Sequence, residues 1–195
     1  MLVTTTYLEQ LSADDLVPAK PPAEPVDIVR AEVPSPEFSR FLYSAVGGDW
    51  FWIDRLAWSR QRWREYLETP LVETWVAWSH GTPAGYIELA GVSTVDTTEV
   101  EIAYFGLLPG FLGRGIGGHL LSVGCQKAWD MASRWPGTPK VSRVWVHTCN
   151  MDGPAALTNY QARGFKPYRV TETEEDVPDS SPSFWAGVPA GQPRD

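Results

Sequence analysis

Residues 112–118 read Leu-Gly-Arg-Gly-Ile-Gly-Gly, and this glycine-rich stretch decides the fold. Residues 97–108 before it predict a strand, because β-branched, aromatic and acidic side chains mix there without a helical stripe until Pro109-Gly110. After the glycines, six residues recur at alternating steps of four and three, as on one face of an α-helix: Gly117, Leu121, Gly124, Ala128, Met131 and Trp135. The chain is therefore organised around a strand, a glycine-rich turn and a helix.

The turn between this strand and this helix can bind an anion. The first backbone N–H groups of a helix have no partner and carry a partial positive charge, so a turn without bulky side chains lets a phosphate approach them. The same glycines can instead form a plain tight turn, by adopting positive φ angles and letting the helix pack closely on the sheet. The glycines alone leave both interpretations open.

The composition fits one globular domain. A chain of 195 residues, 43% hydrophobic and 21% charged, is long enough for a real core. Its net charge of -8 argues against nucleic acid or an anionic membrane as the main partner and is compatible with a cationic amine substrate. The same charge would also simply keep the protein soluble.

The cysteines and histidines suggest neither disulfides nor a metal. Cys125 and Cys149 are the only cysteines and are typical of reduced thiols, and the three histidines do not join them at metal-ligand spacing. Residues 1–10 lack a basic region followed by an apolar run, and no stretch reaches the apolar length of a membrane span. These features predict a cytoplasmic protein.

The first seventy residues predict two strands and two helices. The strands are expected at residues 2–9 and 26–33, separated by a proline-rich segment that forbids regular structure. Ser35 is expected to cap a helix that ends at Gly47-Gly48, and Ser59 a second helix through Leu67. The buried face of the first helix is expected to comprise Phe38, Phe41, Leu42 and Ala45.

Two features of the middle of the chain have more than one interpretation. Residues 49–56 are too aromatic for an ordinary solvent loop, so they either pack in the core or form a wall that receives a cationic substrate. Glu88 interrupts an apolar strand at residues 84–90, and because alternate strand positions are normally solvated we expect its carboxylate to face outward.

The second half predicts further strands and one more helix. Residues 72–79 and 84–90 form a hairpin, and strands follow at 141–148 and 165–173. Asp152 is expected to cap the helix between the last two strands, which Gly164 ends. The pattern predicts a mixed α/β domain whose early strands pair as hairpins and whose later strands can be parallel. From residue 174 the tail is acidic and expected to be mobile, apart from an anchor at Phe184-Trp185.

Over about residues 70–170 the sequence resembles the GNAT superfamily of N-acetyltransferases. The phosphate loop of that family begins with Arg or Gln and continues with small residues, a frame that falls here on Leu112 to Gly117, with Leu112 as a departure. Upstream, Glu101-Ile102 and Leu107-Leu108-Pro109 resemble the strand that carries the general base and contacts the pantetheine arm. Downstream, a further set resembles the helix whose tyrosine reaches the coenzyme A sulfur: Asp152, Ala155-Ala156, Tyr160 and Gly164-Phe165.

This resemblance implies one domain with a mixed, mostly antiparallel sheet, splayed strands at the coenzyme site and helices on both faces. The domain would cover residues 1–175, with a tail at 176–195. Direct acetyl transfer from acetyl-CoA to an amine would follow, with Glu101 as base, the Leu107 and Leu108 N–H groups polarising the thioester and Tyr160 protonating the thiolate. The implied coenzyme-binding residues are Leu107, Leu108, Leu112, Gly113, Arg114, Gly115, Ile116, Gly117, Gly118, Asp152 and Tyr160.

Several alternatives remain. Glu99 lies on the same strand face as Glu101 and could be the base instead, whereas His147 is expected to be packed or hydrogen-bonded rather than catalytic. Gly113, Gly115 and Gly118 also satisfy the GxGxxG pattern of a dinucleotide-binding Rossmann site, but no carboxylate ends the next strand. A non-catalytic module that binds acyl-CoA as a sensor would keep the loop and leave the base idle.

The acceptor amine is the least defined part of the hypothesis. Trp50, Trp52 and Glu88 are candidates for a pocket that receives it, because aromatic and acidic groups suit a cation. The acceptor would be a small-molecule or peptide amine, and a homodimer would be consistent with the resemblance.

Overall fold

The computed structural model describes residues 1–184 and contains one seven-stranded sheet in the order β2-β3-β4-β5-β6-β1-β7. The strands are β1 (Leu2–Gln10), β2 (Asp27–Arg30), β3 (Val72–Ser79), β4 (Thr82–Ser93), β5 (Thr98–Leu107), β6 (Val141–Cys149) and β7 (Lys166–Glu174). The helices are α1 (Pro36–Gly47), α2 (Arg60–Leu67), α3 (Ile116–Trp129), α4 (Met131–Arg134) and α5 (Ala156–Ala162). Three single turns of 3-10 helix complete the order: η1 (Ala13–Asp15), η2 (Gly48–Trp50) and η3 (Pro109–Phe111).

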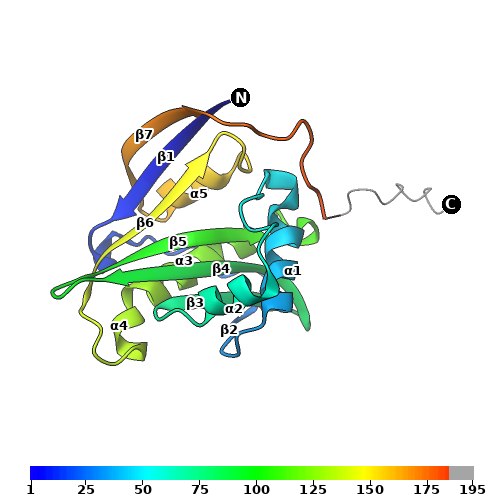
Figure 1. Cartoon of the computed structure of the whole chain (residues 1–195). Coiled ribbons are helices and arrows are strands. Elements are labelled where there is room, and N and C mark those ends of the chain that lie inside the picture. Colours follow the sequence, from blue (N-terminus) through cyan, green and yellow to red (C-terminus); the bar gives the residue numbers. More distant parts are fainter. Residues whose placement is uncertain (185–195) are drawn as a thin grey trace.

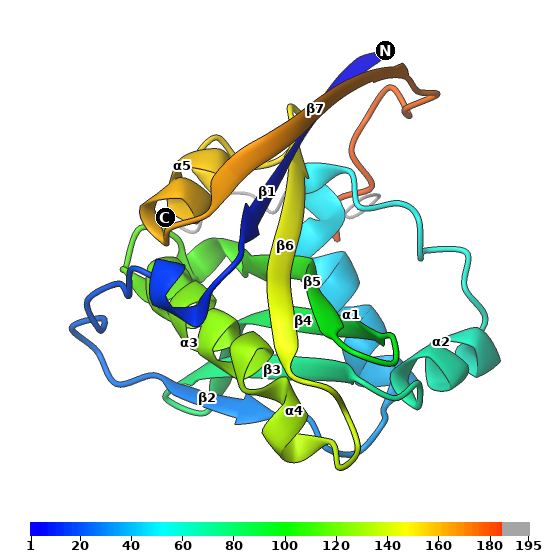
Figure 2. The same ribbon diagram turned by 90° about the vertical axis from the view of Figure 1, so that its left-hand side faces the viewer.

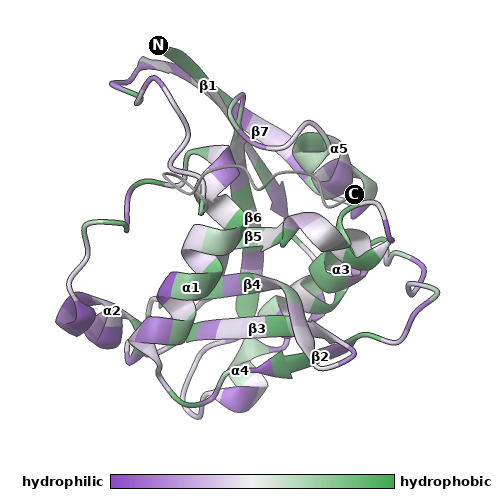
Figure 3. Ribbon diagram, turned by 90° about the vertical axis from the view of Figure 1, so that its right-hand side faces the viewer, coloured by the Kyte–Doolittle hydropathy of each residue, from purple (hydrophilic) through white to green (hydrophobic). Residues whose placement is uncertain are grey.

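Helices cover both faces of the sheet, as predicted. Successive strand residues point to opposite faces, so Ile87 joins the core under α3 whereas its neighbour Tyr86 joins the core under α1. Figure 2 shows α3 and α1 on opposite sides of the strands. Helix α2 is largely hydrophilic in Figure 3, and Trp63 is its one buried residue.

The sheet is mixed and mostly antiparallel. Strands β2 to β5 pair antiparallel in succession, and α3 then carries the chain across to β6, which lies parallel to β5. Four strands that pair antiparallel before the crossover do not make a doubly wound parallel sheet, so the Rossmann alternative is wrong.

The first strand is the exception to the predicted hairpins. Strand β1 lies between β6 and β7 and is antiparallel to both, as Figure 2 shows. The Met1 amino group donates to the Glu175 carbonyl at 2.9 Å, and the Glu175 N–H donates back to the Met1 carbonyl at 3.0 Å. Alternation along a strand fixes which residues share a face but not which strand is the partner, so this pairing could not be predicted.

Two helices differ in detail from the prediction. Ser35 and Ser59 do cap α1 and α2, but α1 buries Leu42, Tyr43 and Val46, while Phe41 is partly exposed. The long helix expected to run to Trp135 is interrupted at Asp130, so α3 and α4 are separate.

The segment after β7 returns to α1. The Ser181 hydroxyl donates to the Gly48 carbonyl at 2.5 Å, and the Phe184 ring packs edge-on against Phe41 with 5.8 Å between centroids. The expected anchor therefore includes Phe184, whereas Trp185 lies outside the described residues. The division into a domain at 1–175 and a tail at 176–195 stays a prediction.

Candidate functional site

Strands β5 and β6 separate half-way along their length. Their last paired residues are Glu101 and Trp145; beyond them β5 continues to Leu107 beside β4 alone, and β6 continues to Cys149 beside β1 alone. Figure 1 shows the two strands diverging towards the end of the sheet where η2 and the C-terminal end of α1 lie. The separation exposes main-chain groups along β5 that have no neighbouring strand.

Of the two predicted main-chain donors at the end of β5, Leu107 and Leu108, one is already used. The Leu108 N–H donates to the Ala84 carbonyl at 2.8 Å, which extends the ladder to β4, so the expectation of a free Leu108 donor is wrong. Successive residues of a strand direct their main-chain groups to opposite edges. The Leu107 N–H therefore faces the opening between β5 and β6.

Residues 112–118, here called the glycine loop, lie beside this opening. A Cβ atom at Gly117 would meet Leu107 Cδ1 at 3.5 Å, which places the first turn of α3 against the end of β5. Gly113 and Gly115 adopt φ angles of 74° and 77°, which favour glycine. The first backbone bond of α3 runs from the His119 N–H to the Gly115 carbonyl, and within residues 1–184 no protein group accepts from the N–H groups of residues 113–118. The loop thus presents free donors at a helix N-terminus.

The side chains of the glycine loop contribute less than its backbone. Leu112 is exposed, and Ile116 is buried in the core under α3. Arg114 forms an ion pair with Glu24 and lies over the Phe111 ring, so its charge is engaged within the protein. Nothing in the sequence indicates this pair, because Glu24 belongs to the proline-rich segment expected to be irregular.

Glu101 and His147 face each other where the strands begin to separate. Glu101 Oε1 lies 3.4 Å from His147 Nδ1, with side chains 27% and 47% exposed. The Glu101 carboxylate holds the pKa of His147 above its ordinary value; burial opposes this, and the charges of Asp152 and Asp54 add to it. Glu99 instead pairs with Arg143 at 3.0 Å, where β5 and β6 are still joined. The geometry therefore favours Glu101 over Glu99 as a base.

Asp152 lies in the turn after β6, and Tyr160 lies on α5, the helix that follows this turn. Asp152 accepts from the Thr148 hydroxyl at 2.6 Å and from the Cys149 N–H at 3.0 Å, so it closes the turn after β6 and is not the cap of α5, where Ala155 stands. Tyr160 is buried, with its ring edge-on to Phe105 of β5 at 6.0 Å. Burial raises the pKa of Tyr160, so the phenol stays protonated.

Trp50 and Trp52 reach the two sides of the opening. The Trp52 ring packs against Tyr104 of β5 with 4.8 Å between centroids, and it would lie 3.8 Å from a Cβ at Gly106. The Trp50 ring would lie 3.5 Å from a Cβ at Gly153, in the turn after β6. The aromatic stretch therefore packs against the sheet and also borders the opening.

Glu88 is buried rather than outward-facing, so that expectation is wrong. Its side chain is 2% exposed, and it accepts from Arg55 Nη1 at 2.8 Å and from the Tyr66 hydroxyl at 2.7 Å. Helices α1 and α2 cover this face of the sheet, which removes the solvent that the alternation argument assumed. Four rings surround the Arg55 guanidinium carbon at 4.2–5.6 Å: Tyr66, Tyr104, Trp58 and Trp63. With both charges paired, Glu88 offers little to an acceptor amine.

The sequence comparison agrees with this architecture. Residues 39–165, more than half of the chain, match the acetyltransferase (GNAT) family. The chain belongs to the GNAT family of acetyltransferases. No curated protein sequence matches it closely enough to add a relative.

Solved structures resemble the chain in fold. A GCN5-related N-acetyltransferase from Kribbella flavida has a TM-score of 0.56 at 19% identity, over 84% of this chain and 54% of that one. One from Sphaerobacter thermophilus has a TM-score of 0.52 at 18% identity, over 87% and 50%. An aminoglycoside acetyltransferase from an uncultured soil metagenomic sample has a TM-score of 0.55 at 17% identity, over 80% and 99%. The chain spans 50–63% of the length of the first five such structures.

The structure gives two residues of this GNAT domain partners that the sequence did not identify. His147 was expected to be packed or hydrogen-bonded, and it is the partner of Glu101. Arg55 belongs to the aromatic stretch at residues 49–56, and the nearby Trp58, Trp63 and Tyr66 are the sequence signal for a cation surrounded by aromatic rings. Within residues 1–184 no cluster could hold a metal ion, and no helix is long and apolar enough to cross a membrane.

The pairing of His147 with Glu101 in this GNAT domain predicts a proton equilibrium. We expect His147 to titrate above the ordinary value of 6.5, and Glu101→Gln to lower its pKa. Because the pKa of His147 is higher in the folded chain than in the unfolded chain, its pairing with Glu101 stabilises the fold fully below the unfolded pKa. This contribution to stability is lost as the pH rises through the folded pKa. Titration of the imidazole by NMR measures this, with Glu99→Gln as the control that leaves the midpoint in place. A midpoint at or below 6.5 would contradict the pairing.

Proposed function

We propose that this GNAT domain is an acetyl-CoA-dependent N-acetyltransferase that moves an acetyl group directly to an amine. The observation that carries the proposal is the opening between β5 and β6, which has Glu101 at its vertex and the free amides of the glycine loop at its end. Family membership makes an acyltransferase the expected class of enzyme.

The residues around the opening fit a pyrophosphate-bearing coenzyme. The N–H groups of residues 113–118 have no acceptor among residues 1–184, and a Cβ at Gly113 would meet nothing within 4 Å, so an anion has donors and room. Leu107 offers its N–H to the thioester end, and Tyr160 lies against Phe105 of the same strand. Leu112 and Arg114 add no free charge, so the backbone would supply the binding.

Acetyl-CoA would supply the thioester, and three groups of this chain would act on the transfer. Glu101 would take the proton of the attacking ammonium, directly or through water, because a protonated amine cannot attack. The Leu107 N–H would stabilise the charge that develops on the thioester oxygen. Tyr160, kept neutral by burial, would donate its proton to the departing thiolate.

The electrostatics of the opening suit a cationic acceptor. Glu101, Asp152 and Asp54 all raise the pKa of His147, so their negative charges act together at this point. The same field would attract an amine, with Trp50 and Trp52 as neighbouring aromatic surfaces. We propose a small-molecule or peptide amine as acceptor, and neither nucleic acid nor an anionic membrane as partner. The homodimer and the cytoplasmic location stay predictions.

The proposal predicts that the chain binds acetyl-CoA and releases coenzyme A when a suitable amine is present. Calorimetric titration with acetyl-CoA and, separately, with NADH tests the first part, and a thiol-release assay across an amine library tests the second. Tight NADH binding without acetyl-CoA binding would overturn the proposal. Acetyl-CoA binding without release by any amine would favour the sensor alternative instead.

A further inference from the structure

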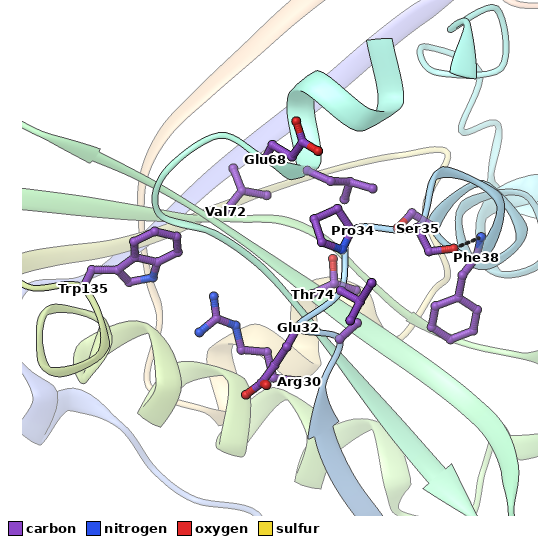
Figure 4. Close-up of a pocket in the computed structure, with 13 residues that line it drawn as sticks. Arg30, Glu32, Pro34, Ser35, Phe38, Glu68, Val72, Thr74 and Trp135 are labelled. Carbon is purple, nitrogen blue, oxygen red and sulfur yellow. Dashed lines mark hydrogen bonds between the residues drawn. The ribbon is translucent and has the colours of Figure 1, made fainter. Parts of the chain in front are cut away.

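The two edges of the sheet differ in how they are protected. Strand β2 ends the sheet on one side after only four residues, and from Arg30 the chain leads past Pro34 to α1, beside a cavity of about 300 Å³ (Figure 4). Strand β7 ends the sheet on the other side (Figure 1); it is nine residues long, and eight of them are exposed. A long exposed edge strand can pair with another chain, so proteins commonly shorten or cover such edges. Strand β7 is therefore the edge that is open to a partner.

The pairing with β1 shows which main-chain groups of β7 face outward. Met1 and Glu175 exchange both of their backbone hydrogen bonds, at 2.9 and 3.0 Å, and the register then continues without a shift as far as Tyr7. Bonded and non-bonded pairs alternate along an antiparallel ladder. Residues 169, 171 and 173 therefore bond to β1, whereas residues 170, 172 and 174 direct their N–H and C=O groups away from it.

This outer row of main-chain groups has no partner strand among residues 1–184. Thr4, which lies opposite Glu172, confirms the alternation, because its carbonyl accepts from the Asn150 N–H at 3.1 Å on the side away from β7. The side chains of the strand also reach solvent: Val170 is 59% exposed and Tyr168 is 43% exposed. The edge thus offers donors and acceptors in register for one further antiparallel strand.

The charges along β7 are segregated by sign. Lys166 and Arg169 lie in its first half, and Glu172 and Glu174 lie in its second half. Within residues 1–184, Arg169, Glu172 and Glu174 form no ion pair, and Lys166, which reaches Asp15 at 3.3 Å, is still 77% exposed. Two copies of this strand that pair antiparallel bring the basic half of each towards the acidic half of the other, whereas a parallel pair would oppose like charges. The charge pattern of β7 is therefore complementary to itself.

We propose that β7 forms the interface of a symmetric homodimer, in which the β7 strands of two copies pair antiparallel and join the two sheets into one. The outward N–H and C=O groups of each strand bond to those of the other, and the two-fold axis passes near Val170 and Thr171. A two-fold interface uses the same surface of both copies, so it requires a self-complementary strand. The proposal gives the expected homodimer a specific interface. It does not depend on acetyl transfer, because β1 and β6 lie between β7 and the opening beside β5.

Sedimentation equilibrium of the full chain over a range of concentrations tests this interface. We expect a monomer–dimer equilibrium that weakens as salt is added, because salt screens the attraction between the two halves of the strand. Glu172→Pro should weaken dimerisation at least tenfold, because it removes an outward N–H, and it should change the melting temperature of the monomer little. Thr171→Pro is the matched control: it removes an N–H that bonds to β1, so it should lower the melting temperature of the monomer.

Charge reversal tests the direction of pairing. A basic variant, Glu172→Lys with Glu174→Lys, and an acidic variant, Lys166→Glu with Arg169→Glu, each give the strand one sign of charge. Each variant alone should dimerise at least tenfold more weakly than the unaltered chain, because like charges then face each other. An equimolar mixture of the two should form a heterodimer, since a basic strand then meets an acidic one.

Three outcomes would overturn the proposal. The first is an unaltered chain that stays monomeric at millimolar concentration in low salt, which would leave the edge to solvent or to a different protein. The second is a dimer that neither Glu172→Pro nor charge reversal weakens, because its interface then lies elsewhere. The third is a mixture of the basic and acidic variants that forms no heterodimer. None of these results bears on the proposed acetyl transfer, because the measurement uses neither acetyl-CoA nor an amine.

Discussion

Glu101→Gln is expected to lower kcat/KM for amine acetylation on the order of 10²- to 10⁴-fold, while acetyl-CoA binds as tightly as before. The amide keeps the size of the side chain but cannot accept the proton of the ammonium. The glycine loop, which would bind the coenzyme, lies at the other end of the opening and does not contact Glu101. Steady-state kinetics with calorimetric titration of acetyl-CoA separates the two effects.

Glu99→Gln is the matched control for this experiment. Glu99 lies two residues earlier on the same strand, but its carboxylate binds Arg143 where β5 and β6 are still paired, so its loss should leave turnover close to that of the unaltered chain. Turnover that survives Glu101→Gln but falls in Glu99→Gln would assign the base to Glu99. If the chain is a sensor, neither Glu101→Gln nor Tyr160→Phe has a turnover to remove.

Arg55→Ala is expected to destabilise the fold by about 3–5 kcal/mol. The change leaves the Glu88 carboxylate buried on β4 with only the Tyr66 hydroxyl as partner, and it empties the ring of aromatic side chains around the guanidinium. Replacing both charges, as Arg55→Met with Glu88→Leu, should recover much of the loss, because a buried pair exchanged for apolar groups is often tolerated. Urea unfolding measures both variants.

A surface ion pair provides the control for this prediction. Glu37 and Arg60 are 2.5 Å apart, but both side chains are 64% exposed, so Glu37→Gln should change the unfolding midpoint little. An Arg55→Ala variant as stable as Glu37→Gln would show that water reaches Glu88 and that the cluster contributes little to the fold.

The sequence predicted the features that depend on neighbouring residues. Ser35 and Ser59 were identifiable as caps because capping joins residues only three apart, and the glycine loop because a strand, positive-φ glycines and a helical stripe follow one another directly. The hairpin of β3 and β4 follows from a short connection. The same local signals, with their order along the chain, were enough to indicate the family.

The sequence could not predict features that depend on what packs against a residue. Glu88 was expected in solvent because strand alternation says nothing about the helices that cover a face. Leu108 was expected to be a free donor, but whether a main-chain group is free depends on where its neighbouring strand ends. Asp152 was expected to cap a helix, but its carboxylate accepts hydrogen bonds from Thr148 and Cys149, the two residues that end β6, rather than from the first turn of α5.

The position of β1 has a consequence for the order of folding. This strand leaves the ribosome before both of its partners, which lie more than 130 residues further along the chain. Contacts between such distant segments form slowly, because a long loop must close before they stabilise anything. During synthesis β1 therefore stays unpaired and exposed until β6 and β7 have emerged, which makes it a natural substrate for a holding chaperone.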